Sequence, residues 1–166
     1  MTVVNKAAFI ERYGGIYEHS PWVAERAWDS LCEPGTTATV ANALAEAVDD
    51  ADHAQKLALI RAHPDLAGRA AVKGELTRES TGEHASAGID QCAPEEFARF
   101  QDFNERYRQK FGFPFVMAVR NSNRHAILAA FEERLQNDPD TEFARALAEI
   151  HKIARLRLAA LEEDQE

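Results

Sequence analysis

Residues 94–119 read PEEFARFQDFNERYRQKFGFPFVMAV, and this stretch decides the fold class. Pro94 followed by Glu95 and Glu96 is typical of a helix start, because proline suits the first helical position and acidic side chains favour the positive end of the helix dipole. Aromatic residues then recur every three or four positions, which predicts a helix with a buried aromatic stripe made of Phe97, Phe100, Phe103, Tyr107 and Phe111. Gly112 is expected to end this helix.

The run Phe113 to Val119 is compact, apolar and rich in aromatic and β-branched residues. Since no second run of this kind exists to pair with it, we expect an extended segment and no sheet. Apolar periodicity and capping signals predict further helices over about 5–13, 21–31, 37–50, 52–62, 123–136 and 141–163. Asn5 and Ser20 are the expected N-caps of the first two. We therefore predict a compact all-α bundle of about eight helices that forms a single domain over residues 1–166.

The composition limits the classes of partner. The chain has 166 residues, 45% of them hydrophobic, and a formal net charge of -9. That size supports one hydrophobic core without disulfides, and the negative charge argues against nucleic acid and against membrane surfaces as partners. No signal-peptide pattern and no apolar run of about 20 residues is present, so we expect a cytoplasmic protein. Cys32 and Cys92 lie too far apart for a redox or zinc motif, and we assign them no chemistry.

One arginine interrupts the apolar face of the last predicted helix. Residues on this face follow one another at steps of three and four: Phe143, Leu147, Ile150, Ala154, Arg157 and Leu161. A buried unpaired charge costs several kcal/mol, so an internal carboxylate or an anionic ligand should meet the guanidinium of Arg157. The alternative is that its aliphatic stem lies along the core while its head reaches water.

Two short segments carry candidate catalytic groups. Ser80 to Glu83 has the S-x-x-E spacing of a capping box, which explains both residues by helix initiation. The first turn of such a helix could also form a pocket for an anion or a carbonyl, with Glu83 beside it. His63 precedes Pro64, which disfavours helix at His63, so the imidazole sits at a helix exit and could face a cleft.

Other readings of the histidines remain open. A lone histidine is more often a surface or packing residue than a catalyst, and we interpret His19, His53, His125 and His151 in that way. A weak metal-ligand set is also conceivable, formed by His63, Asp65, Glu83 and His84. It lacks the H-E-x-x-H spacing and the cysteine cluster of well-defined zinc sites.

Four motifs, taken in order, resemble one enzyme family. They are EHSPW at 18–22, RAHPDLAG at 61–68, LTRES at 76–80 with Glu83 following, and FGFPFV at 111–116. In this order and spacing they resemble the 2-oxo-4-hydroxy-4-carboxy-5-ureidoimidazoline (OHCU) decarboxylases of urate degradation. The likeness extends from about Phe9 to Leu161.

The resemblance implies an all-helical, usually dimeric enzyme that uses neither a cofactor nor a metal. Its small-molecule substrate would be the ureidoimidazoline OHCU, and its product (S)-allantoin. By position, His63 and Glu83 correspond to the catalytic residues of the family. The residues that the resemblance assigns to substrate binding are Pro64, Ser80, Thr81, Gly82, Glu83, His84, Phe115, Val116, Met117, Ala118, Val119 and Arg157.

One position departs from the family pattern. His84 stands where the family commonly has glutamine, and imidazole cannot offer the paired donor and acceptor of an amide. Two rival functions remain. A metal-dependent ureide hydrolase would use the four-residue set around His63, and a non-catalytic helical interaction module would present the aromatic stripe of 97–111 as an exposed partner face.

Overall fold

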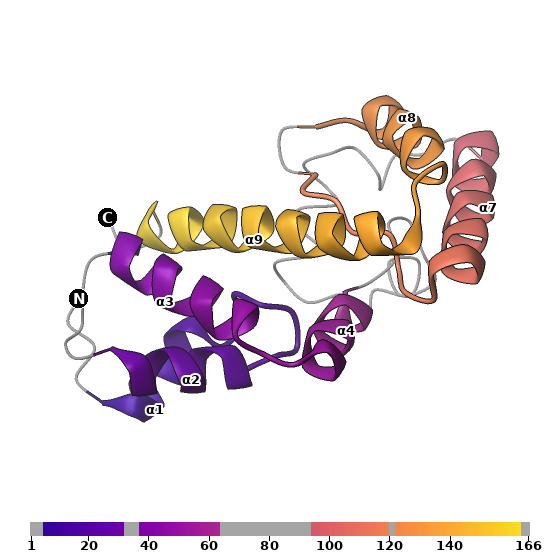
Figure 1. The fold of residues 1–166 in the computed structure, drawn as a ribbon. Coiled ribbons are helices and arrows are strands. Elements are labelled where there is room, and N and C mark those ends of the chain that lie inside the picture. The colour runs from indigo at the N-terminus through magenta and orange to yellow at the C-terminus, as the bar shows by residue number, and fades with distance from the viewer. Residues whose placement is uncertain (1–4, 32–36, 64–93, 120–121, 164–166) are drawn as a thin grey trace. The chain divides into compact units, whose positions relative to one another are not determined.

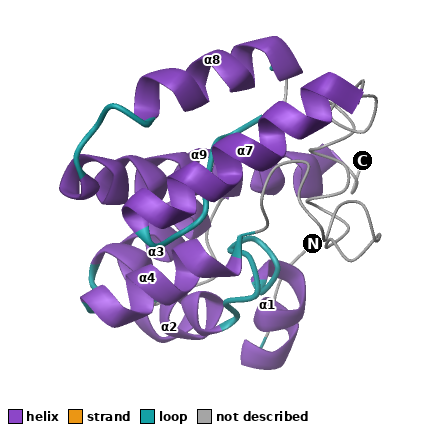
Figure 2. Cartoon of the chain, turned by 90° about the vertical axis from the view of Figure 1, so that its right-hand side faces the viewer, coloured by secondary structure: helices purple, strands orange, loops and turns teal. Residues whose placement is uncertain are grey.

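The structure is a computed structural model, and it describes residues 5–31, 37–63, 94–119 and 122–163. Every element in these ranges is a helix or a loop, as Figure 2 shows. The seven described helices are α1 (Lys6–Tyr13), α2 (Trp22–Ser30), α3 (Thr37–Asp49), α4 (His53–Ala62), α7 (Pro94–Phe111), α8 (Arg124–Arg134) and α9 (Pro139–Glu163). The predicted all-α class is confirmed. No described helix combines the length and the apolarity that crossing a bilayer requires.

Side-chain caps and one glycine define several helix boundaries. Asn5 Oδ1 accepts a hydrogen bond from the amide of Ala8 at 2.8 Å, and Asn123 Oδ1 accepts one from Ala126 at 2.9 Å, so each residue satisfies an amide that the first turn leaves open. Gly112 adopts a φ of 78°, a left-handed conformation that glycine tolerates best, and ends α7 as predicted.

Two helix starts differ from the prediction. The Ser20 hydroxyl donates to the carbonyl of Glu18 at 2.9 Å and caps no helix, so Pro21 takes the N-cap position and α2 begins at Trp22. The last helix begins at Pro139, two residues before the expected start, because Asp138 Oδ1 accepts from the amide of Thr141 at 2.7 Å.

The chain divides into two compact units. The first comprises residues up to Ala62 together with those from His151 onward, and the second comprises His63–Ile150, so α9 contributes to both. In the first unit α2 contacts both α1 and α3, and the ring of Phe9 packs against those of Tyr13 and Trp28. That residues 1–166 form a single domain stays a prediction.

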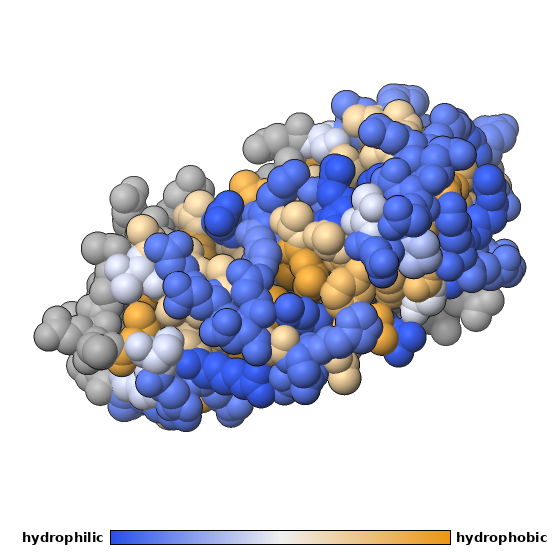
Figure 3. Space-filling model, viewed as in Figure 1, coloured by the Kyte–Doolittle hydropathy of each residue, from blue (hydrophilic) through white to orange (hydrophobic). Residues whose placement is uncertain are grey.

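The aromatic stripe of α7 forms the core of the second unit. Phe100, Phe103, Tyr107 and Phe111 are buried, as predicted, and Phe97 is half-buried. Helices α7 and α8 lie side by side (Figure 1), and the ring of Phe131 on α8 stacks on that of Phe103 with centroids 5.4 Å apart. Hydrophilic residues cover most of the outer face of α7 and α8 (Figure 3), so the stripe is not an exposed partner face.

The run Phe113 to Val119 forms neither helix nor strand, which agrees with the prediction of an extended segment outside any sheet. Five of its residues are buried: Phe113, Pro114, Phe115, Val116 and Val119. The ring of Phe115 stacks on that of Phe131 at 3.8 Å between centroids. Side chains of this run therefore complete the aromatic core that α7 and α8 begin.

We expect Phe131→Ala to lower the free energy of unfolding by about 3–5 kcal/mol, because it removes the ring on which Phe103 and Phe115 stack and leaves a cavity. Chemical denaturation followed by circular dichroism measures this loss. Phe97→Ala is the matched control, since Phe97 is only half-buried, and it should cost clearly less. Equal losses at the two positions would contradict a core centred on Phe131.

Candidate active site

His63 directly follows Ala62, the last residue of α4, and its side chain is only 5% exposed. The predicted helix exit is confirmed, and the imidazole is buried in the protein. The other predicted residues of this region lie outside the described residues: Pro64, Ser80, Thr81, Gly82, Glu83 and His84. The capping box of Ser80 and Glu83 and the placement of Glu83 beside His63 therefore stay predictions.

Arg157 on α9 is buried, at 4% exposure, and an internal carboxylate meets it. Its Nη2 donates to Glu18 Oε2 at 2.8 Å, and its Nη1 donates to the carbonyls of Gly15 and Ile16 at 3.3 Å each. Of the alternatives that the sequence left open, a head group extending to water is wrong. The loop between α1 and α2 therefore provides three acceptors for the guanidinium: the carboxylate of Glu18 and two carbonyl oxygens.

A second chain of hydrogen bonds anchors the same loop to α9 and α3. The Tyr17 hydroxyl lies 2.8 Å from His151 Nδ1, and His151 Nε2 lies 3.2 Å from Asp49 Oδ1. Burial and the charge of Asp49 raise the pKa of Tyr17, so its hydroxyl stays protonated. The carboxylate of Asp49 can only accept, which favours the tautomer in which Nδ1 accepts from this hydroxyl. That leaves the Nε2 proton facing the carboxylate.

The interpretation of His151 as a surface or packing residue agrees with its half-buried position and its ring contact with Tyr17, but its hydrogen-bond partners were not predicted. Tyr17 and His151 are 134 positions apart, and no local pattern in the sequence links them. The substrate-facing role of Arg157, and a cavity shared by His63, Glu83 and Arg157, stay predictions.

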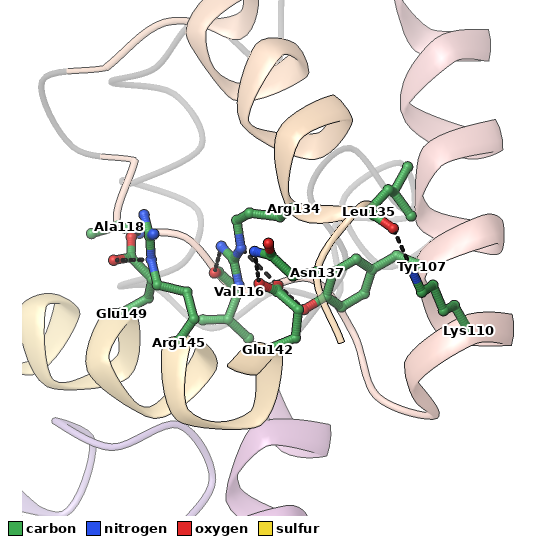
Figure 4. Close-up of polar contacts among 10 residues, drawn as sticks. All are labelled: Tyr107, Lys110, Val116, Ala118, Arg134, Leu135, Asn137, Glu142, Arg145 and Glu149. Carbon is green, nitrogen blue, oxygen red and sulfur yellow. Dashed lines mark hydrogen bonds and ion pairs between the residues drawn. The ribbon is translucent and has the colours of Figure 1, made fainter. Parts of the chain in front are cut away.

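A buried ion pair holds the run Phe113 to Val119 against α8 and α9 (Figure 4). Arg134 Nη1 donates to the carbonyl of Val116 at 2.7 Å, and Arg134 Nε donates to Glu142 Oε1 at 2.8 Å. The guanidinium carbon of Arg134 also lies 4.3 Å from the ring centroid of Phe115. The ion pair therefore contacts both the backbone and an aromatic ring of this run.

Glu142 is fully buried and receives hydrogen bonds from two further side chains. The Tyr107 hydroxyl donates to its Oε1 at 2.6 Å, and Asn137 Nδ2 donates to its Oε2 at 2.9 Å. Burial, and secondly the hydrogen bond to Glu142, raise the pKa of Tyr107, so the phenol remains a donor. Sequence reasoning missed this cluster, because Arg134 looked like an ordinary basic residue in a last helical turn.

A second glutamate of α9 contacts the neighbouring peptide. Glu149 Oε1 accepts a hydrogen bond from the amide of Ala118 at 3.1 Å, and Glu149 Oε2 accepts one from Arg145 Nε at 3.3 Å. The N–H and C=O of a trans peptide point in opposite directions, and no cis peptide occurs in the described ranges. Because Arg134 holds the carbonyl of Val116 and Glu149 holds the amide of Ala118, the N–H and C=O of Met117 point away from these two side chains.

Met117 is half-buried, and within the described ranges its peptide N–H and C=O have no hydrogen-bond partner. The N–H donor and the C=O acceptor of Met117 therefore have a fixed orientation. This arrangement can bind a ligand that carries both a carbonyl and an N–H.

The described residues contain no group of three histidine, cysteine, aspartate or glutamate side chains placed to hold a metal ion. Of the metal-ligand set considered from the sequence, only His63 falls within the described ranges, and Asp65, Glu83 and His84 lie outside them.

We expect Arg134→Ala to lower the free energy of unfolding by about 3–5 kcal/mol, because it leaves the carboxylate of Glu142 buried without its cation. Tyr107→Phe removes one donor from a carboxylate that keeps the others, so it should cost about 2 kcal/mol. Urea denaturation compares the two variants. A Tyr107→Phe variant as unstable as Arg134→Ala would show that the ion pair is not the main element of the cluster.

For Arg157 the matched variants are Lys and Ala. Arg157→Ala leaves the buried Glu18 without its cation and should cost about 3–5 kcal/mol, whereas Arg157→Lys keeps a positive charge facing Glu18 and should lose clearly less. Midpoints of thermal or urea unfolding give both values. If both variants lose the same stability, then charge pairing with Glu18 is not what Arg157 contributes to the fold.

Comparison with known proteins gives a consistent result. The sequence model of the family described as OHCU decarboxylase matches residues 2–159. A 2-oxo-4-hydroxy-4-carboxy-5-ureidoimidazoline decarboxylase of Haloferax volcanii is 48% identical over 153 residues, which cover 92% of this chain and 88% of that protein.

Two solved structures resemble this one. A crystal structure of (S)-allantoin synthase superposes with a TM-score of 0.72 at 35% identity, over 95% of this chain and 51% of that longer chain. The second is an OHCU decarboxylase crystallised in the presence of (S)-allantoin. It superposes with a TM-score of 0.74 at 22% identity, over 90% of this chain and 96% of that one, and supports the fold alone.

Proposed function

The chain belongs to the OHCU decarboxylase family, and we propose that it removes carbon dioxide from 2-oxo-4-hydroxy-4-carboxy-5-ureidoimidazoline in urate degradation, leaving (S)-allantoin. The observation that carries this proposal is the family match over residues 2–159, because it includes all four motifs and His63. The burial of His63 directly after α4 supports it, since a buried imidazole is shielded from bulk water.

The reaction needs little from the protein beyond placement and proton transfer. When the bond between the ring carbon and the carboxylate breaks, the electron pair stays on the ring and is delocalised into the adjacent imine of the substrate. The substrate thus supplies its own electron sink, so a pyridoxal or thiamine cofactor is unnecessary. The former imine nitrogen takes up a proton. The neighbouring hydroxyl loses its proton to become a carbonyl, and the former imine carbon gains a proton on one face, which sets the configuration of the product.

We assign the proton transfer to His63, with Glu83 holding its orientation and charge state. Arg157 would fix an anionic or carbonyl group of the substrate through its planar guanidinium. The run Phe115 to Val119 would hold the substrate through backbone groups, for which the peptide of Met117 has suitable geometry.

We further propose that the protein acts as a cytoplasmic homodimer without a cofactor, as the family resemblance implies. The net charge of -9 supports a location away from anionic lipid surfaces. Light scattering on the purified protein would test the dimer: a mass near twice 18.5 kDa supports it, and the mass of one chain contradicts it.

The decisive experiment adds the protein to freshly generated OHCU and follows the optical activity of allantoin by circular dichroism. We expect fast appearance of one enantiomer, and a rate equal to the protein-free control would reject the function. Repeating the assay after chelation separates the decarboxylase from a metal-dependent hydrolase, since only the hydrolase should lose activity.

In the same assay His63→Asn should lower turnover by about 10²–10⁴-fold, because general acid–base catalysis contributes that much to rate. His125→Asn is the matched control, as His125 is exposed on α8, and it should leave turnover unchanged. Unfolding temperatures establish that both variants fold. Unchanged turnover in a folded His63→Asn protein would remove this histidine from the mechanism.

A further inference from the structure

Two glutamates of α9 hold neighbouring peptides of the run Phe115 to Val119. Glu142 acts through Arg134 on the carbonyl of Val116, and Glu149 acts directly on the amide of Ala118 (Figure 4). The two glutamates are seven positions apart, which is about two helical turns and places both on one face of α9. Both side chains are buried. Glu149 contacts this stretch of backbone directly, and Glu142 contacts it through Arg134.

The segment needs such anchors because it has no partner strand among the described residues. In a sheet, ladder hydrogen bonds would fix the orientation of each peptide plane. Here a charged group fixes one atom of each of two successive peptides, and hydrogen bonds to charged groups are the stronger kind. Packing of Phe115 on Phe131 holds the side chains, but it leaves the peptide planes to these polar contacts.

We propose that Glu142 and Glu149 are positioning residues of the active site. They set the peptides on either side of Met117 so that its N–H and C=O face the substrate. This inference rests on the proposed function, since it gives a role to the backbone that is expected to bind OHCU. Neither glutamate touches the substrate, and each acts through the peptide that it holds.

Glu149 is the better residue to test, because Glu142 also stabilises the fold through Arg134 and Tyr107. Glu149→Ala removes the acceptor for the Ala118 amide, and we expect KM for OHCU to rise about ten-fold, with a smaller fall in kcat. Glu149→Gln keeps a side-chain oxygen at the same reach and should restore KM to within about three-fold of the parent value.

Arg145→Ala is the matched control, because it removes the half-exposed partner of Glu149 and leaves the bond to Ala118 in place. It should leave KM and kcat unchanged. Unfolding temperatures are recorded for every variant. If Glu149→Ala does not fold, Glu149→Asp serves instead, because it keeps the charge but draws the oxygen back by one methylene, and it should raise KM in the same way.

An unchanged KM and kcat in folded Glu149→Ala or Glu149→Asp would overturn the proposal, as would a lowered unfolding temperature with unaltered kinetics. A Glu149→Gln variant as impaired as Glu149→Ala would also overturn it, since the shared acceptor oxygen would then be irrelevant. Failure of the proposed function has a different signature, which is a parent protein that does not accelerate formation of (S)-allantoin at all.

Discussion

The carboxylate of Glu142 is the constraint on which the second compact unit depends. It is fully buried, and taking such a charge out of water costs several kcal/mol unless donors surround it. The donors come from α7 through Tyr107, from α8 through Arg134 and from the following loop through Asn137. Together these donors compensate the charge, with Arg134 as its cation. The cluster therefore specifies one arrangement of these segments, and through Arg134 it extends that order to the backbone at Val116.

The first unit also contains a buried charge, which here is a cation in place of a carboxylate. The cation of Arg157 is buried, and the loop between α1 and α2 meets it with the carboxylate of Glu18 and two carbonyls. Tyr17 on the same loop contacts His151 on α9, so Gly15, Ile16, Tyr17 and Glu18 all join the loop to that helix. Under the proposed function, the substrate would contact a guanidinium whose orientation is already set and whose charge is partly balanced.

Local features of the chain could be predicted from the sequence, because their causes are local. The stripe of α7, the cap at Asn5 and the stop at Gly112 all depend on residues within a few positions. Even there, Ser20 failed as a cap, because its hydroxyl bonds to the carbonyl of Glu18. The burial of Arg157 followed from its helix face, but its partner lies 139 positions away and no periodicity identifies it. Within the site, His63 was placed correctly at a helix exit, whereas Glu149 gave no signal, because its contact is with a peptide group.

Holding Val116 and Ala118 by their peptide atoms separates recognition from side-chain identity. Every residue except proline carries the same N–H and C=O. Binding of a ligand at Met117 would therefore depend on the backbone conformation and not on the side chain at this position. Many exchanges at Met117 would then be neutral for binding as long as the course is kept. Substrate preference would instead depend on residues that do not contact the substrate. Changes in preference would then begin at Glu142, Glu149 and Arg134, which hold the backbone of the segment.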